Sequence, residues 1–148
     1  MKKVLVLCTG NSVRSQMAEA YLKFYAKGYG IFFSAGLQPQ GINPYAARVM
    51  EEDNIDLNEH LSKSIDAFAN IHFDYLLTVC PEAEAQIPDL FSYQQHLHFP
   101  VPDPASFEGS EEDTLQHFLQ VREMIKKNML QFIGRCLMPQ TEAEPLNR

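Results

Sequence analysis

The residues most able to do chemistry lie near the N-terminus, where Cys8 and Arg14 are separated by five residues. The segment between them reads Thr9-Gly10-Asn11-Ser12-Val13. Its glycine and asparagine are types that adopt positive φ angles, so the backbone of residues 9–14 can curl around an anion with its N–H groups inward. Arg14 can hold two oxygens of that anion, and Ser15 can donate its hydroxyl to the sulfur of Cys8. We therefore predict an oxyanion-binding loop with the Cys8 thiolate as nucleophile.

A proton donor for the leaving group is expected later in the chain, at Asp103. This residue stands in Val101-Pro102-Asp103-Pro104-Ala105, after a predicted strand. The flanking prolines hold Asp103 extended, and an apolar setting would keep its carboxyl group partly protonated, as a general acid requires. An ordinary turn aspartate before proline is the other interpretation. The position after a strand favours the catalytic one.

The predicted elements place both groups at one edge of a sheet. Apolar runs predict strands over residues 3–8, 31–33, 75–79 and 96–99. Helices are predicted from Arg14 to the glycines at 28 and 30, from Asn43, over residues 81–86, and over residues 111–133 with a stop at Gly134. This alternation is typical of an α/β fold, whose open parallel sheet binds ligands at the carboxyl ends of its strands.

Length and composition indicate one domain over residues 1–135, followed by a polar tail over residues 136–148. The chain has 148 residues, 45% of them hydrophobic, and no apolar run approaches the roughly 20 residues that cross a bilayer. A net charge of −7 argues against a nucleic-acid partner, and no membrane association is expected. Three cysteines are an odd and sparse set, which predicts free thiols in a reducing compartment and hence a cytoplasmic protein.

Together, these motifs resemble the low-molecular-weight protein tyrosine phosphatase superfamily, and within it the arsenate reductase branch of the thioredoxin-coupled type. The resemblance is carried by Cys8 to Glu19, Ser34-Ala35-Gly36, Asn43-Pro44, Leu76 to Cys80, and Asp103-Pro104-Ala105. It implies a four-stranded parallel sheet of strand order 2-1-3-4 with helices on both faces.

The resemblance also implies a reaction. Cys8 would attack a bound arsenate, Cys80 would attack the arsenic-bound sulfur, and arsenite would leave behind a Cys8–Cys80 disulfide. The implied catalytic set is completed by Arg14, Ser15 and Asp103. No bound cofactor is expected, and the partner would be an external thiol reductant, either thioredoxin or glutathione with glutaredoxin.

Two departures from this branch are visible. Thioredoxin-coupled relatives carry a third cysteine seven residues after the second, and this chain has Ile87 there. Either an external thiol attacks the disulfide directly, or turnover as a reductase fails. Cys136 is expected to be a bystander thiol. Val13 replaces a loop cysteine of many relatives, which leaves catalysis intact.

Two alternatives stay open. The chain could be a low-molecular-weight protein tyrosine phosphatase that hydrolyses phosphoesters of phosphoproteins through a phosphocysteine. That branch has an aromatic pair after its Asp-Pro, whereas this chain has Ala105 and Ser106. Tyr45 or Phe107 could line a substrate groove, although packing is the expected role of both. The third interpretation is an oxyanion or redox sensor; a phosphocysteine carrier is disfavoured because such carriers lack the loop arginine.

No metal site is predicted. In some relatives a carboxylate at the position of Lys63 helps to bind a monovalent cation, and here the lysine could supply that charge itself. His96 and His98 lie on one face of a predicted strand by period-two alternation. Because no third ligand stands nearby in the sequence, we expect both to face solvent.

Overall fold

The computed structural model describes residues 1–138. Its strands are β1 (Lys2–Cys8), β2 (Gly30–Gly36), β3 (Phe73–Thr78) and β4 (Tyr93–His98). They form a four-stranded sheet in which all neighbours are parallel and the order is β2-β1-β3-β4. The predicted α/β fold with strand order 2-1-3-4 is therefore confirmed.

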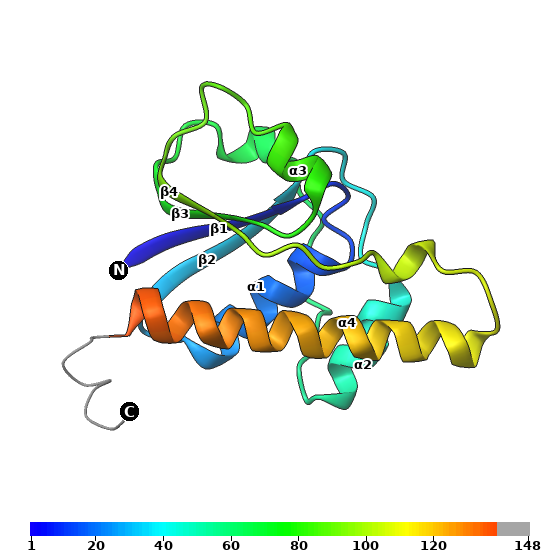
Figure 1. Ribbon diagram of the computed structural model, residues 1–148. Helices are drawn as coiled ribbons and strands as arrows, with labels where there is room; N and C mark the ends of the chain where they lie inside the picture. The colour runs from blue at the N-terminus through cyan, green and yellow to red at the C-terminus, as the bar shows by residue number, and fades with distance from the viewer. Residues whose placement is uncertain (139–148) are drawn as a thin grey trace.

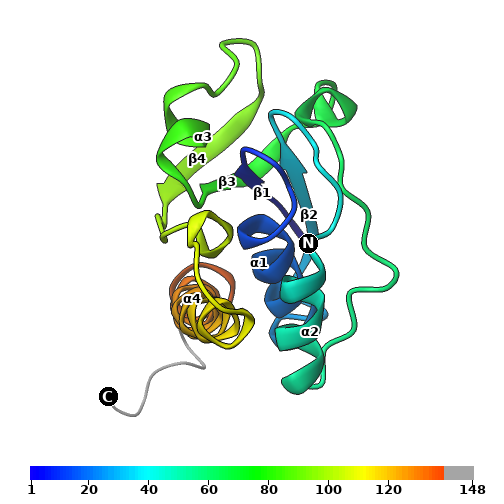
Figure 2. The ribbon, with the colours of Figure 1, turned by 90° about the vertical axis from the view of Figure 1, so that its right-hand side faces the viewer.

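Helices cover both faces of this sheet (Figure 1). The α-helices are α1 (Arg14–Tyr25), α2 (Pro44–Glu52), α3 (Pro81–Ala85) and α4 (Glu111–Phe132). Two 3-10 helices, η1 (Ile65–Phe68) and η2 (Pro104–Ser106), lie in connecting segments, and a π-helical turn, η3 (Ile133–Leu137), extends α4. α3 lies on one side of the sheet, and α1, α2 and α4 lie on the other. Figure 2 shows α1 closest to the sheet there, with α4 and α2 packed beside it.

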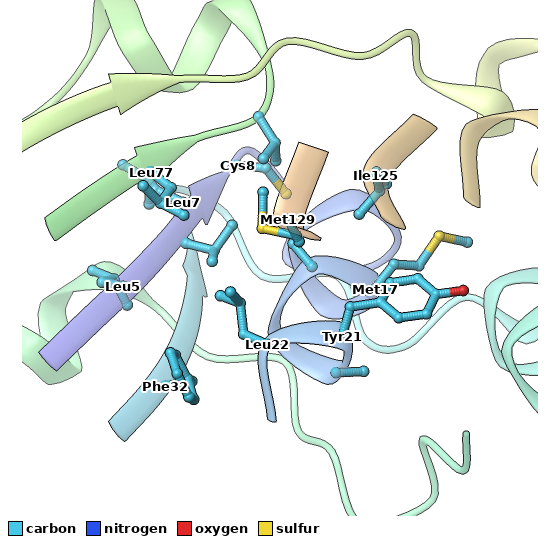
Figure 3. Packing of buried hydrophobic residues seen from close by; sticks show 14 of the residues in the cluster. Leu5, Leu7, Cys8, Met17, Tyr21, Leu22, Phe32, Leu77, Ile125 and Met129 are labelled. Carbon is cyan, nitrogen blue, oxygen red and sulfur yellow. The ribbon is translucent and has the colours of Figure 1, made fainter. Parts of the chain in front are cut away.

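The central strand β1 explains why both faces are covered. Residues 4–7 are an unbroken apolar run and are fully buried. On one face they meet α1 and α4, whose Tyr21, Ile125 and Met129 lie among the buried side chains around β1 (Figure 3). Burial of the strand on both faces fixes its last residue, Cys8, at the carboxyl edge of the sheet, where ligands of such folds bind.

Several element boundaries differ from the prediction. α1 ends at Tyr25, before the glycines expected to stop it, because Gly28 (φ 92°) instead forms the turn into β2. β2 extends to Gly36, beyond its apolar part. β4 begins at Tyr93, three residues earlier than predicted, because its first residues are largely polar and carry no apolar signal. α4 passes into a π-helical turn that runs through Gly134 instead of stopping there.

The predicted boundary between domain and tail, after residue 135, falls within this π-helical turn. Residues 139–148 of the predicted tail lie outside the described residues. In the part of the chain that the structure describes, no helix is long and apolar enough to cross a bilayer.

Candidate active site

A pocket of about 800 Å³ opens at the carboxyl edge of the sheet. The loop after β1 lines it with residues 8–10 and 12–14. The other walls come from segments remote in sequence: Gln40, Asn43, Pro81, Glu82, Pro100, Val101, Pro102, Asp103, Ala105 and Ser106. The structure thus brings the predicted nucleophile, arginine and carboxylate to one cavity.

The backbone of the loop is turned so that its N–H groups are available to an anion. The carbonyl oxygens of Cys8, Thr9, Gly10 and Ser12 accept hydrogen bonds of 2.8–3.1 Å from backbone N–H groups of residues 37–43. A trans peptide holds its C=O and the following N–H in opposite directions, so the next N–H groups point away from that segment. They are left for the oxygens of an anion beside the positive end of α1.

The side chain of Asn11 stabilises the loop through hydrogen bonds to neighbouring segments. It is fully buried with a φ of 47°, whereas Gly10, predicted to share that conformation, does not adopt a positive φ. The amide nitrogen of Asn11 donates to the hydroxyls of Ser15 and Ser34, both at 2.8 Å, and its amide oxygen accepts from the backbone N–H of Lys63. The side chain points into this network, and Asn11, which we predicted as part of the anion-binding loop, is not among the residues that line the pocket.

Cys8 is almost fully buried, and its sulfur lies 3.0 Å from the hydroxyl oxygen of Ser15. That oxygen already accepts a hydrogen bond from Asn11. A Cys8 thiolate has no hydrogen to give, so in that form of the enzyme Ser15 is the donor of this contact. A donor aimed at the sulfur favours the thiolate, the form that attacks an electrophile.

A buried acid, Glu19, lies behind the loop and accepts the hydrogen of Ser34. Two lysines balance its charge: Lys23 forms an ion pair of 2.7 Å, and Nζ of Lys63 lies 4.0 Å away. Burial lowers the pKa of Lys63, and the nearby Glu19 opposes that shift. Lys63 thus lies with its Nζ near Glu19, and the role of its charge in place of a cation stays a prediction. Sequence reasoning missed Lys23, although its spacing of four residues from Glu19 on one helix was a usable signal.

The network continues to His60, whose Nδ1 lies 2.9 Å from Oε1 of Gln16. The amide nitrogen of Gln16 donates to the carbonyl oxygens of Asn11 and Leu61. Its Oε1 is therefore an acceptor, and Nδ1 of His60 carries the hydrogen. Burial lowers the pKa of His60. Sequence reasoning missed this pair because its members are 44 positions apart.

Arg14 and Asp103 meet at the pocket. Arg14 donates to the carbonyl oxygen of Val101 at 3.1 Å, and a second guanidinium nitrogen lies 3.9 Å from Oδ2 of Asp103. The other carboxyl oxygen of Asp103 accepts from the N–H of Ala105 at the start of η2. The side chain of Asp103 is 43% exposed, so the predicted apolar setting is wrong. The extended, proline-flanked loop leaves the carboxyl group at the open rim of the pocket.

Cys80 lies two residues beyond the end of β3 and is fully buried. Its sulfur is 3.4 Å from the hydroxyl of Thr9, the neighbour of Cys8. Because β1 and β3 are paired strands, the two thiols stand at the ends of adjacent strands. Ile87 follows α3 and packs against the core.

The third thiol, Cys136, lies in the π-helical turn, where its carbonyl oxygen accepts a hydrogen bond from the hydroxyl of Tyr75. Burial raises the pKa of Cys136. Figure 1 shows this turn, in orange, near the end of the sheet at which β1 begins. Cys136 is thus remote from the edge that carries Cys8 and Cys80.

Gly36, at the end of β2, is a site residue that sequence reasoning did not single out. A Cβ at this position would lie 2.7 Å from the carbonyl oxygen of Thr9 and 2.8 Å from the backbone nitrogen of Asn11. Only glycine therefore lets the loop approach β2 this closely. The residue stands in a segment that supports the family resemblance, but nothing in the sequence reveals the contact.

The aromatic residues considered for a substrate groove pack elsewhere. Tyr45 lies against Phe118 with ring centroids 5.4 Å apart, and Phe107 stacks on His117 at 3.7 Å. Of the described residues that line the pocket, none is aromatic. Among residues 1–138, the pocket lining thus offers no ring to flank that of a phosphotyrosine.

The predicted exposure of His96 and His98 is wrong, because both side chains are half-buried. The hydroxyl oxygen of Thr78 lies 2.8 Å from Nε2 of His96 and 2.7 Å from Nδ1 of His98. Nε2 of His98 is 3.3 Å from a carboxylate oxygen of Glu84. Burial lowers the pKa of His96. Sequence reasoning missed Glu84 because α3 brings it to β4 only in the folded chain.

This fold and this loop define a family. The chain matches the model of the low molecular weight phosphotyrosine protein phosphatase family over residues 3–143, and it belongs to that family. Within it, the chain is 37% identical over 131 residues to an arsenate reductase of Halalkalibacterium halodurans, a match that covers 88% of this chain and 94% of that protein. The family resemblance predicted from the motifs is confirmed.

Solved structures of arsenate reductases are similar to this chain as well. An arsenate reductase in its oxidized state superposes with a TM-score of 0.79 at 28% identity, and one in a phosphate-binding state superposes with a TM-score of 0.71 at 28% identity. Each match covers 91% of this chain and 98% of the other.

Proposed function

We propose that this chain is an arsenate reductase that uses Cys8 and Cys80 as its redox pair. The observation that carries the proposal is the placement of two buried thiols at the ends of adjacent strands, one of them in an oxyanion loop. The β1–β3 register pairs Leu7 with Thr78, so Cys80 lies one residue beyond the position opposite Cys8. A strand spacing of about 4.8 Å and a rise of about 3.3 Å per residue then give a Cα separation of roughly 5.8 Å, within the range of about 4.4–6.8 Å that a disulfide accepts. A phosphoester hydrolase would need only the first thiol. The similarity to arsenate reductases supports the same assignment.

In the first step, the Cys8 thiolate attacks the arsenic of an arsenate held by the loop N–H groups and Arg14. A sulfur–arsenic bond forms and one arsenic–oxygen bond breaks. Asp103, at the exposed rim of the pocket, passes a proton taken up from water to the leaving hydroxide, which departs as water. The hydroxyl of Ser15, 3.0 Å from Sγ, can donate to the thiolate before the attack.

In the second step, the sulfur of Cys80 attacks Sγ of Cys8. A sulfur–sulfur bond forms, and the electron pair of the sulfur–arsenic bond moves onto arsenic. Arsenic is thereby reduced from As(V) to As(III) and leaves as arsenite, which takes the proton of the Cys80 thiol. The two sulfurs together lose the two electrons that arsenic gains.

An external thiol reductant, thioredoxin or glutathione with glutaredoxin, returns the enzyme to its reduced form. Ile87 occupies the place of a relay cysteine, and Cys136 lies towards the other end of the sheet. The reductant therefore attacks the Cys8–Cys80 bond directly. Thiol systems of this kind keep the cytoplasm reducing, and we assign the protein to that compartment.

Hydrolysis of phosphoesters is the second candidate function. It is favoured by the family and by the ion pair that holds Asp103 beside Arg14, the arrangement that a phosphocysteine mechanism needs. The lining of the pocket near η2 consists of Ala105 and Ser106, which offer no surface for an aromatic ring. We therefore expect the chain to hydrolyse small phosphoesters more slowly than it reduces arsenate.

The test is a single exposure of the reduced chain to arsenate, with no other thiol present. We expect the mass to fall by about 2 Da, peptide mapping to join Cys8 to Cys80, and arsenite to appear in equal amount. Cys80→Ser should abolish arsenite release yet still hydrolyse p-nitrophenyl phosphate. Cys136→Ser, the matched removal of the third thiol, should change neither reaction. An unchanged mass with continued hydrolysis would assign the chain to the phosphatases instead.

A further inference from the structure

Three potential metal ligands lie close together outside the oxyanion pocket, beside the edge strand β4. His96 and His98 come from β4, and Glu84 comes from α3. One ligand atom from each residue can be chosen so that all three lie within 4.8 Å of one another. None of these residues lines the pocket described above.

The fold explains why these side chains converge. Residues two apart on a strand point to the same face, so both histidines project from one side of β4. α3 lies over this side of the sheet (Figures 1 and 2), and it carries Glu84 to the two rings. Glu84 is exposed while the histidines are half-buried, so an ion from solvent can reach the cluster.

We propose that Glu84, His96 and His98 form a binding site for a divalent transition metal, with Zn²⁺ as the best match. Two imidazoles and one carboxylate form a ligand set that zinc accepts, and a fourth tetrahedral position is left to water. Zinc bonds of about 2.0–2.1 Å place neighbouring ligand atoms roughly 3.3 Å apart. Nε2 of His98 and Oε1 of Glu84 already lie 3.3 Å apart. The other ligand atoms, which lie within 4.8 Å of one another, close to this distance when the ion binds.

Thr78 supplies hydrogen bonds that orient the two histidine rings, as residues behind the ligands do in metal sites. Its hydroxyl, which is fully buried, lies 2.7 Å from Nδ1 of His98 and leaves Nε2 facing Glu84. A metal-binding histidine characteristically donates its other N–H to such a group, which fixes its ring orientation. The same hydroxyl contacts His96, so one buried oxygen orients both rings.

Metal binding at this place has a consequence for the redox pair. Cys80 is the residue from which α3 starts, so a bond from Glu84 to an ion on β4 ties that helix to the sheet. A sulfur–sulfur bond of about 2.05 Å draws Cys80 towards Cys8, and with it the start of α3. Resting on the proposed function, we therefore expect bound Zn²⁺ to slow disulfide formation, whereas hydrolysis of p-nitrophenyl phosphate does not require that movement.

The binding test uses the full chain with Cys8, Cys80 and Cys136 replaced by serine, so that no thiolate competes for the ion. Calorimetric titration with Zn²⁺ should show one ion per chain, and bound Co²⁺ should give the visible spectrum of tetrahedral coordination. His98→Ala and Glu84→Gln should each weaken binding at least tenfold, and Thr78→Val should weaken it by about 10–100-fold. The matched control is His72→Ala, which removes an exposed histidine bonded to Ser92 and should change nothing.

Equal Zn²⁺ affinity in the Glu84→Gln variant, the His98→Ala variant and the parent protein would overturn the proposal. The contacts of these residues with one another and with Thr78 would then serve only to stabilise the fold. Far-UV circular dichroism identifies any variant that fails to fold. The effect on chemistry is measured separately, as the rate of arsenate-driven disulfide formation in the wild-type cysteine background with and without Zn²⁺. If Zn²⁺ still slows disulfide formation in the His98→Ala variant, the effect is due to binding of the ion to the cysteine thiolates. Failure of arsenate reduction without metal would contradict the proposed function while leaving the metal site intact.

Discussion

At the scale of single residues, the reactivity of the nucleophile Cys8 is expected to depend on a hydrogen bond from the hydroxyl of Ser15. The hydroxyl of Ser15 can donate to a Cys8 thiolate while its oxygen accepts from Asn11. The spacing of cysteine, arginine and serine was sufficient to predict that these groups meet. The role of Asn11 could not be predicted, because its other partners, Ser34 and Lys63, are 23 and 52 positions away along the chain. The exposure of Asp103 likewise depends on a rim built from distant segments.

Removal of this hydroxyl should therefore make Cys8 less reactive. A hydrogen bond to a charged group contributes about 1.5–3 kcal/mol, so we expect Ser15→Ala to slow alkylation of Cys8 by iodoacetamide near neutral pH by about 10–100-fold. The measurement uses a chain with Cys80→Ser and Cys136→Ser, which leaves one thiol to react. Ser15→Thr keeps a hydroxyl and should restore most of the rate. Equal rates for the alanine variant and its parent would show that the sulfur does not depend on this donor.

At the scale of elements, the anion loop is shaped by the end of β2 as much as by its own sequence. The apolar run of β1 was enough to predict that strand, residues 9–13 the loop between β1 and α1, and Asn43 the start of α2. The polar start of β4 and the contact of the loop with Gly36 were not predictable. Both arise from pairing with a neighbouring strand or loop, which a local pattern does not record.

Gly36→Ala should consequently impair oxyanion binding. The new Cβ would meet two backbone atoms of the loop at 2.7 and 2.8 Å, and backbone atoms can yield only if the loop itself moves. We expect the dissociation constant of inorganic phosphate, measured by calorimetry, to rise at least tenfold. The matched control is Gly134→Ala, where an added Cβ meets nothing within 4 Å. An unaltered phosphate affinity in Gly36→Ala would mean that the loop accommodates the methyl group without loss of its N–H geometry.

At the scale of the whole molecule, three helices on one side of the sheet are joined by a polar contact at Asp53. This residue follows α2 directly as its C-cap. It accepts a hydrogen bond of 2.6 Å from Tyr21 of α1 and forms an ion pair of 3.2 Å with Lys126 of α4. The alternation of strands and helices predicted that these helices exist. It could not predict the contacts between these helices, because Tyr21, Asp53 and Lys126 share no local motif. The hydrogen bond from Tyr21, assisted by Lys126, lowers the pKa of Asp53.

This shift predicts how stability depends on pH. Asp53 is more acidic in the folded chain, so its contribution is fully present above its unfolded pKa of about 3.9 and is lost as the pH falls through the lowered folded value. We expect Asp53→Asn to reduce the free energy of unfolding by about 1–2 kcal/mol at pH 7, and the difference from wild type to shrink below about pH 4. Urea denaturation between pH 3 and pH 7 measures it, with the exposed Glu52→Gln as the control. A deficit that stays constant down to pH 3 would mean that the asparagine variant loses packing rather than a charged contact between the helices.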